Sequence, residues 1–160
     1  MDKYEELKTI GRGAFAVVRL VRRKADDALL ACKTMRCGMA ELSAKERMEL
    51  TQEVKLLHTL QHPNVVGFID NLIDADGIMH ILMEYAGGGT LHKAIVNREG
   101  EYLPEDTIWE IFVQLVLAIK FIHASNVMHR DLKTQNVLMG GPQHRYVKVA
   151  DFGIAKVLQS

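Results

Sequence analysis

The hydrophobic and polar positions in the first part of the chain alternate in short runs that are typical of strands. Three runs of apolar and β-branched residues, over 7–10, 17–23 and 28–35, predict strands. Asp26 and Asp27 place turn-forming side chains between the second run and the third. We therefore expect this region to form antiparallel strands that are connected by short turns.

One helix is expected after the third strand. Ser43 and Glu46 have the spacing of a capping box, and Pro63 ends the helical pattern. Three apolar residues recur at helical spacing and define the face that should be buried: Leu50, Val54 and Leu57. Glu53 lies on the same face, where a carboxylate is costly to bury without a partner, so the helix requires a cation nearby.

Two more strands are predicted over 65–73 and 78–83, and 74–77 forms a hairpin turn between them. The glycine run 87–89 separates this region from a helical one. Residues 108–122 are apolar almost all the way around a helix, so that helix must be buried over most of its circumference, although little sequence follows to cover it. The predicted fold class is α+β, an antiparallel sheet with one inserted helix, followed by a mainly helical part.

Composition narrows the classes of partner. The chain has 20 basic and 20 acidic residues and a formal net charge of 0, so no strong field attracts nucleic acid or an acidic membrane. No apolar run reaches membrane-spanning length, and the N-terminus lacks a signal sequence. Cys32 and Cys37 are expected to be reduced thiols rather than a disulfide, which predicts a cytoplasmic or nuclear protein.

The segment 11–18 is the first candidate for phosphate binding. Gly11 and Gly13 would let backbone N–H groups approach phosphate oxygens closely, and Ala16 stands where a third glycine would complete the pattern. The segment precedes a strand and not a helix, which argues against a dinucleotide-binding turn. A plain turn between strands is the alternative for these residues taken alone.

Lys33 is a charged residue in an otherwise apolar predicted strand. Such a lysine either extends its amine to solvent at an edge or pairs with a buried anion. Glu53, the inward-facing carboxylate of the predicted helix, favours the pair.

The segment 129–136 is the most specific chemical signal. Asp131 can accept the proton of an attacking hydroxyl, and Lys133 can neutralise charge on a transferred phosphoryl group. Asn136 and Asp151 provide the hard oxygen ligands that suit Mg²⁺. A polar surface loop is the alternative, and the Asp-Phe-Gly sequence that begins at Asp151 argues strongly against it.

In this order, the four signals resemble those of eukaryotic serine/threonine protein kinases, and 129–137 and 151–158 are most similar to the NIMA-related (NEK) kinases. Lys133, two residues after Asp131, resembles the serine/threonine branch rather than the tyrosine branch. The resemblance extends over 4–160. It implies a protein-kinase-like fold with an N-lobe sheet, one inserted helix and the first, mainly helical part of the C-lobe.

The resemblance also implies a role for each candidate. Lys33 would pair with Glu53 and contact the phosphates of ATP, and Asp131 would be the catalytic base, assisted by Lys133. Mg²⁺ would be held by Asn136 and Asp151. Further ATP contacts are implied. The phosphate loop would use Gly11, Gly13 and Ala16, and the hinge backbone would use Glu84 and Ala86. The adenine pocket would be lined by Val18, Ala31 and Leu138.

A set of four stacked residues is implied to align the two lobes: Leu57, Phe68, His129 and Phe152. Thr90 departs from the family pattern, because relatives often carry an acidic ribose-binding residue there. Met83 would stand at the back of the adenine pocket, as the gatekeeper.

The function implied is transfer of the γ-phosphoryl of ATP to serine or threonine of protein substrates, with no nucleic acid or membrane partner. The expected domains are 1–86, the N-lobe and hinge, and 87–160, a partial C-lobe that ends inside the activation segment. We expect the chain to be C-terminally truncated and inactive by itself. The alternative is a short, non-catalytic module that binds nucleotide or acts as a decoy.

Overall fold

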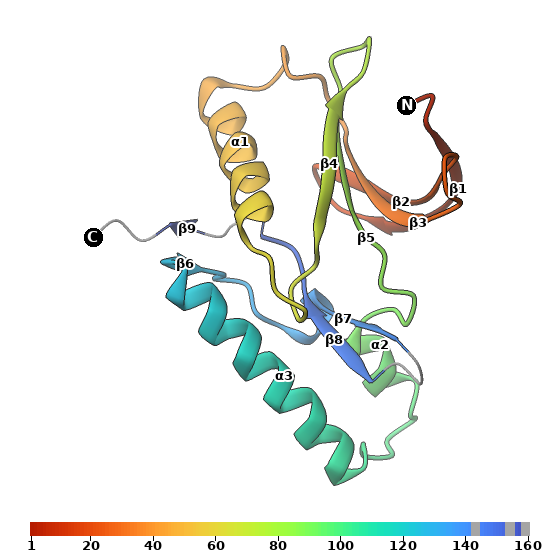
Figure 1. The fold of residues 1–160 in the computed structure, drawn as a ribbon, viewed down its shortest axis with the longest axis vertical. Coiled ribbons are helices and arrows are strands. Elements are labelled where there is room, and N and C mark those ends of the chain that lie inside the picture. The colour runs from red at the N-terminus through yellow and green to blue at the C-terminus, as the bar shows by residue number, and fades with distance from the viewer. Residues whose placement is uncertain (142–144, 153–155, 158–160) are drawn as a thin grey trace. The chain divides into compact units, whose positions relative to one another are not determined.

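The chain divides into two units in the computed structural model (Figure 1). The structure describes residues 1–141, 145–152 and 156–157. The first unit comprises Met1–His58 and Gly67–Tyr85, and the second comprises Thr59–Val66 and Ala86–Ser160. The short segment Thr59–Val66 therefore belongs with the second unit, although it lies between two parts of the first in the sequence. The division into domains at residues 86 and 87 stays a prediction.

A five-stranded antiparallel sheet in the order β1-β2-β3-β5-β4 dominates the first unit. The strands are β1 Tyr4–Arg12, β2 Ala16–Arg23, β3 Leu29–Met35, β4 Phe68–Ile73 and β5 Met79–Glu84. The predicted antiparallel sheet is thus confirmed. The prediction that a strand begins at 65 is wrong, because Val65 instead bridges to Val149 within the second unit.

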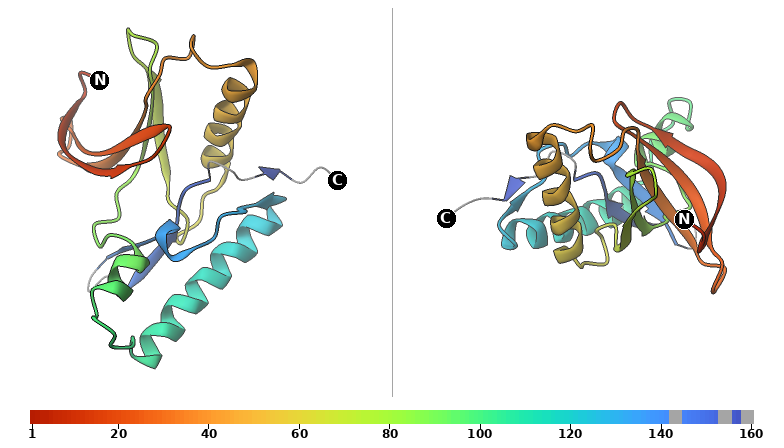
Figure 2. Two further views of the ribbon diagram at one scale, coloured as in Figure 1. Left: turned by 180° about the vertical axis from the view of Figure 1, so that it is seen from behind. Right: turned by 90° about the horizontal axis from the view of Figure 1, so that it is seen from above.

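The helix of the first unit, α1 (Ala44–Thr59), begins with the predicted capping box. The Ser43 N–H and hydroxyl donate to Glu46 Oε2 at 2.8 and 2.6 Å, and the Glu46 N–H donates to Ser43 Oγ at 3.3 Å. Leu50 and Leu57 are buried and Val54 is half-buried, as predicted. In the views of Figures 1 and 2, α1 lies nearer to β4 and β5 than to β1.

The second unit contains helices and short antiparallel strand pairs. Its elements are α2 Leu91–Val96, α3 Glu105–Ala124, β6 Val127–Met128, the 3-10 turn η1 Thr134–Asn136, β7 Val137–Gly140, β8 Tyr146–Val149 and β9 Lys156–Val157. β7 pairs with β8 and β6 pairs with β9, both antiparallel. A cluster of buried side chains from α2, α3, β7 and β8 forms its core: Leu91, Ile111, Val137, Met139 and Val147.

A polar network fixes the segment Thr59–Val66 to β8 and α3. Asn64, which is 6% exposed, donates from Nδ2 to Gln114 Oε1 and to the Val147 carbonyl, each at 2.9 Å. The Val147 N–H donates to the same Gln114 oxygen at 3.0 Å, and the Val149 N–H donates to the Asn64 carbonyl at 2.8 Å. Because buried polar groups must be paired, these contacts hold β8 in one position.

The glycine run 87–89 is attached to β7. The Gly88 N–H donates to the Met139 carbonyl, and the Met139 N–H donates to the Gly89 carbonyl, both at 2.8 Å. Gly89 has a φ of 75°, a left-handed conformation that glycine adopts without steric cost. The predicted linker is therefore ordered at its end by backbone pairing.

α3 presents a broad apolar face to solvent. Among its residues only Ile111, Ala118 and Ile122 are buried. Six large apolar side chains are between 48 and 56% exposed: Ile108, Trp109, Phe112, Val113, Val116 and Leu117. We predicted that this helix must be buried over most of its circumference, but the described residues leave much of it uncovered. In the described part of the chain, α3 is also the one helix long and apolar enough to cross a bilayer, a criterion that soluble core helices meet as well.

Candidate catalytic site

Asp131 lies at the centre of the polar segment that follows β6. Its Oδ2 accepts hydrogen bonds from Lys133 Nζ at 2.7 Å and from Asn136 Nδ2 at 2.9 Å. Asn136 Nδ2 also donates to the Asp131 backbone carbonyl at 2.9 Å. The structure therefore brings together three of the predicted catalytic residues. Both donors contact Oδ2, and no hydrogen bond among the described residues engages the second carboxylate oxygen, Oδ1.

The contacts of Asp131 keep it ionised. The hydrogen bond from Lys133 and, to a smaller extent, that from Asn136 lower the pKa of its carboxyl, against a partial opposing effect of desolvation. Both donors favour the charged form of the carboxylate. Asp131 is consequently a carboxylate at neutral pH, able to accept a proton.

His129 joins this segment to the residues before Asp151. Its Nε2 lies 3.0 Å from the Ala150 carbonyl, and its Nδ1 lies 3.3 Å from the N–H of Asp131. Since the N–H of Asp131 donates and the carbonyl accepts, Nδ1 is the acceptor of the ring and Nε2 is its donor. His129 is 3% exposed, and its ring packs on Phe152 with a centroid separation of 4.9 Å.

Asp151 is positioned through its neighbour. The Ala150 N–H donates to the Asn136 carbonyl at 2.9 Å, while the Ala150 carbonyl accepts from His129. Asp151 itself is exposed and has a φ of 65°, and Arg130 has a φ of 66°. Left-handed backbone is uncommon in residues with a side chain and tends to occur at functional sites.

The donor atoms at this site suit a hard cation. Asn136 uses its amide nitrogen for both bonds to Asp131, so its oxygen, Oδ1, is the atom left to act as a ligand. This oxygen and the Asp151 carboxylate are both of the ligand type that Mg²⁺ prefers. No cluster of three or more histidine, cysteine or acidic side chains that could hold a metal occurs among the described residues.

The predicted ATP-contacting residues of the first unit share one face of its sheet. Val18 on β2 lies opposite Lys33 on β3, and Ala31 lies opposite Met83 on β5. Paired residues and residues two apart along a strand point to the same side of a sheet. Val18, Ala31, Lys33 and Met83 therefore point to one side of the sheet, and their contact with ATP stays a prediction.

The pair of Lys33 with Glu53 stays a prediction, because the Glu53 side chain lies outside the described part of the structure. Gly153, the last residue of the Asp-Phe-Gly sequence, lies outside it as well.

The glycine-rich segment forms the connection between β1 and β2. The Gly13 N–H donates to the Ala16 carbonyl at 2.8 Å, which closes the turn, and Phe15 is 76% exposed at its tip. Neither Gly11 nor Gly13 has a positive φ, and a Cβ on either would meet its nearest neighbour at 3.5 Å. Local sterics in this turn therefore do not demand glycine, so close approach to a phosphate stays a prediction.

The other implied adenine contacts are found in both units. In the first, Glu84 donates its backbone N–H to the Gly67 carbonyl at 2.8 Å. In the second, Ala86 lies near Gly140, and the half-buried Leu138 on β7 bridges to Thr90. Their contact with adenine stays a prediction.

Two roles were not predicted from the sequence. Thr90 caps α2, since its Oγ1 accepts from the Lys93 N–H at 3.2 Å. On the sheet face opposite Lys33, His80 is 5% exposed and lies 3.0 Å from Thr34 Oγ1 and 2.8 Å from Asp74 Oδ2. No sequence pattern pointed to either contact. The contact of Thr90 depends on where α2 begins, and those of His80 depend on the register of the strands.

The chain is similar to known proteins over its whole length. Residues 4–160 match the protein kinase domain family. The chain is 43% identical over its full length to serine/threonine-protein kinase Nek8 of Danio rerio, and 42% identical to probable serine/threonine-protein kinase nek3 of Dictyostelium discoideum. It is 38% identical over 98% of its length to serine/threonine-protein kinase Nek2 of Homo sapiens. The chain spans 22, 14 and 36% of the lengths of these three relatives.

Proposed function

Because this chain belongs to the protein kinase family and its relatives are NIMA-related serine/threonine kinases, we propose that the protein transfers the γ-phosphoryl group of ATP to serine or threonine hydroxyls of protein substrates. The chain would provide the nucleotide-binding sheet and the catalytic segment. The observation that carries this proposal is the set of contacts around Asp131. Lys133 and Asn136 donate to one of its oxygens and keep the carboxyl group ionised.

The proposed chemistry follows from these contacts. Asp131 Oδ1 accepts the proton of the substrate hydroxyl, whose oxygen forms the new bond to the γ-phosphorus while the bond to the β–γ bridging oxygen breaks. Lys133 is half-exposed, at 49%, so its ammonium can also reach charge that develops on the transferred group. Mg²⁺, held by Asn136 and Asp151, would neutralise the phosphate oxygens.

The arrangement favours catalysis over the non-catalytic alternative. Nucleotide binding alone requires no base, whereas Asp131 is held by a cation and an amide that maintain its ionisation. Both donors contact Oδ2, which leaves Oδ1 for a substrate hydroxyl.

The test is transfer of labelled phosphate from Mg·ATP to a generic serine-containing acceptor protein. The intact protein should be active, and Asp131→Asn should lose at least about a hundredfold in turnover. Asp106→Asn makes the same chemical change at an exposed residue of the first turn of α3 and should retain activity. An active Asp131→Asn variant would contradict the assigned base.

A further inference from the structure

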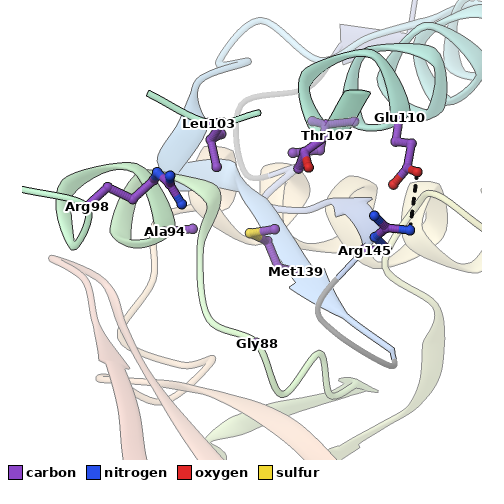
Figure 3. Close-up of a pocket in the computed structure, with 9 residues that line it drawn as sticks. Gly88, Ala94, Arg98, Leu103, Thr107, Glu110, Met139 and Arg145 are labelled. Atoms are coloured by element: carbon purple, nitrogen blue, oxygen red, sulfur yellow. Dashed lines mark ion pairs between the residues drawn. The ribbon is translucent and has the colours of Figure 1, made fainter. Parts of the chain in front are cut away.

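The second unit contains a cavity of about 300 Å³, and Asp131 is not among the residues that line it. α2, the loop after it, α3 and β7 surround the cavity (Figure 3). Ala94, Leu103 and Met139 contribute apolar surface, while Arg98, Glu110 and Arg145 contribute charge. Concave sites with an apolar lining and a few polar groups are typical of ligand recognition.

The charged side chains that line this cavity are two arginines and one glutamate, so the lining carries a net positive charge. Arg145 pairs with Glu110 through a contact of 3.4 Å. Arg98 donates from Nε to the Glu101 carbonyl at 3.1 Å and from Nη2 to the Tyr102 carbonyl at 2.8 Å. These carbonyls orient the guanidinium without neutralising it, and no ion pair of Arg98 occurs among the described residues. In the view of Figure 3, Arg98 and the Glu110–Arg145 pair lie on opposite sides of Met139.

An arginine held in this way is suited to a carboxylate. A guanidinium has five N–H donors, and the two carbonyls use only two of them. The remaining donors can form charge-assisted hydrogen bonds whose geometry matches a carboxylate. Since the arginine is already oriented by its own loop, less conformational entropy is lost when a ligand binds.

The surroundings favour a peptide over an isolated small molecule. The volume lies at the lower end of the range for small-molecule sites, which suits one inserted side chain with part of its backbone. Exposed apolar side chains continue beyond the cavity along α2 and its following loop: Ile95, Val96 and Tyr102. Tyr102 is 91% exposed, and tyrosine is enriched at protein interfaces.

We propose that this cavity docks a short acidic segment of a partner protein. A branched aliphatic side chain enters between Leu103 and Met139, and the carboxylate of the adjacent glutamate or aspartate pairs with Arg98. The inference rests on the proposed kinase function only in that the partner would be a substrate or a regulator of that kinase. Binding itself requires no phosphoryl transfer.

The probe is a fluorescein-labelled peptide with one leucine followed by one glutamate between glycine spacers. It lacks hydroxyl side chains, so it cannot be phosphorylated, and its binding to the intact protein is measured by fluorescence anisotropy. Saturable binding is expected, with at least about a tenfold loss when glutamine replaces the glutamate, because a charge-assisted hydrogen bond is lost. A similar loss is expected when alanine replaces the leucine.

Protein variants test the same contacts from the other side. Arg98→Gln should weaken the peptide about tenfold, and Ala94→Leu should weaken it by filling the cavity. Lys93→Gln removes one exposed positive charge from α2, the helix that carries Ala94, at a position outside the cavity lining, and should bind the peptide normally. ATP binding and phosphoryl transfer to a generic acceptor should be unchanged in all three variants, so a failed docking site and a failed kinase assignment give different results.

Three results would overturn the docking proposal. One is the absence of saturable binding to the unaltered protein, and another is equal weakening by Lys93→Gln and Arg98→Gln. The third is equal binding of the leucine and alanine peptides, which would reduce the interaction to general charge attraction. The peptide comparisons use the unaltered protein, so they decide the question even if a variant does not fold.

Discussion

The His80 Nε2 of β5 lies 2.8 Å from the Asp74 carboxylate, at the turn between β4 and β5. The carboxylate can only accept, so the imidazole donates. Its other nitrogen, Nδ1, lies 3.0 Å from Thr34 Oγ1 on β3. A single buried ring thus connects the hairpin turn to the strand that carries Lys33 on its other face.

Replacing His80 with alanine should lower stability. The change removes a buried ring and leaves the Thr34 hydroxyl without this partner, which typically costs about 1–3 kcal/mol. His92→Ala alters an exposed histidine and should have a much smaller effect. Urea denaturation of both variants provides the comparison, and equal stability of His80→Ala and the unaltered chain would show that the connection contributes nothing.

Asp74→Asn should remove a pH-dependent part of the stability. The hydrogen bond from His80 and those from the backbone N–H groups of Ile78 and Asp76 lower the pKa of the Asp74 carboxyl. An unfolded aspartate has a pKa of about 3.9. The contribution is therefore complete above about pH 4 and is lost as the pH falls through the lower pKa of the folded state.

The measurement is the difference in unfolding free energy between the unaltered chain and Asp74→Asn, followed from neutral pH into the acid range. The difference should shrink below about pH 4. Asp76→Asn changes an exposed carboxylate in the same turn and is measured beside it as the matched control. A constant difference for Asp74→Asn would show that this carboxyl titrates alike in both states.

Lys33→Met should leave the fold nearly intact and remove most phosphoryl transfer by the intact protein. Lys33 is half-buried on the sheet face shared with Val18 and Ala31. Loss of electrostatic stabilisation of this kind commonly costs about 3 kcal/mol, or roughly a hundredfold in rate. Turnover is measured beside the melting temperature, and near-normal turnover would remove Lys33 from the proposed machinery.

Asp131→Asn and Asp151→Asn should fail in different ways. The first removes the proposed base, so the variant should still bind Mg·ATP. The second removes a proposed metal ligand, so nucleotide affinity should lose its dependence on Mg²⁺. ATP titrations of both variants with and without Mg²⁺ separate the two roles, and identical behaviour would mean that they are wrongly divided.

The 160-residue chain by itself should self-associate, bind a hydrophobic dye and phosphorylate no peptide measurably. The apolar face of α3, with Trp109 and Phe112 about half exposed, is the reason. Val116→Gln together with Val113→Gln should reduce dye binding without unfolding the sheet of the first unit. A monomer that melts cooperatively and phosphorylates peptides would contradict this expectation.

Local patterns in the sequence predicted the elements whose causes are local. The capping box at Ser43 and the strands of the sheet could be predicted because turn residues and apolar periodicity act over a few positions. The beginning of β4 was wrongly placed, since Val65 has the same β-branched character whether it joins that strand or bridges to Val149. Only tertiary pairing distinguishes the two.

The residue types of the proposed catalytic segment were predictable from the sequence, but its geometry was not. The residue types of Asp131, Lys133 and Asn136 indicate phosphoryl-transfer chemistry. Their spacing does not reveal that Lys133 and Asn136 both contact the same oxygen of the Asp131 carboxylate. Likewise, His129 contacts the Ala150 carbonyl, which lies in a segment distant in the sequence. Arg98 is oriented at the cavity by carbonyls of its own loop. Such contacts leave no periodic signal.

The left-handed backbone at Arg130 and Asp151 has a consequence for protein engineering. A side chain in this conformation commonly costs about 1–3 kcal/mol, which glycine would relieve. A screen for heat resistance would therefore favour glycine at these two positions, one adjacent to the proposed base and the other a proposed metal ligand. Thermal selection on this domain should be combined with selection for turnover, because a gain in melting temperature at either of these two positions comes where the proposed chemistry can least tolerate a change.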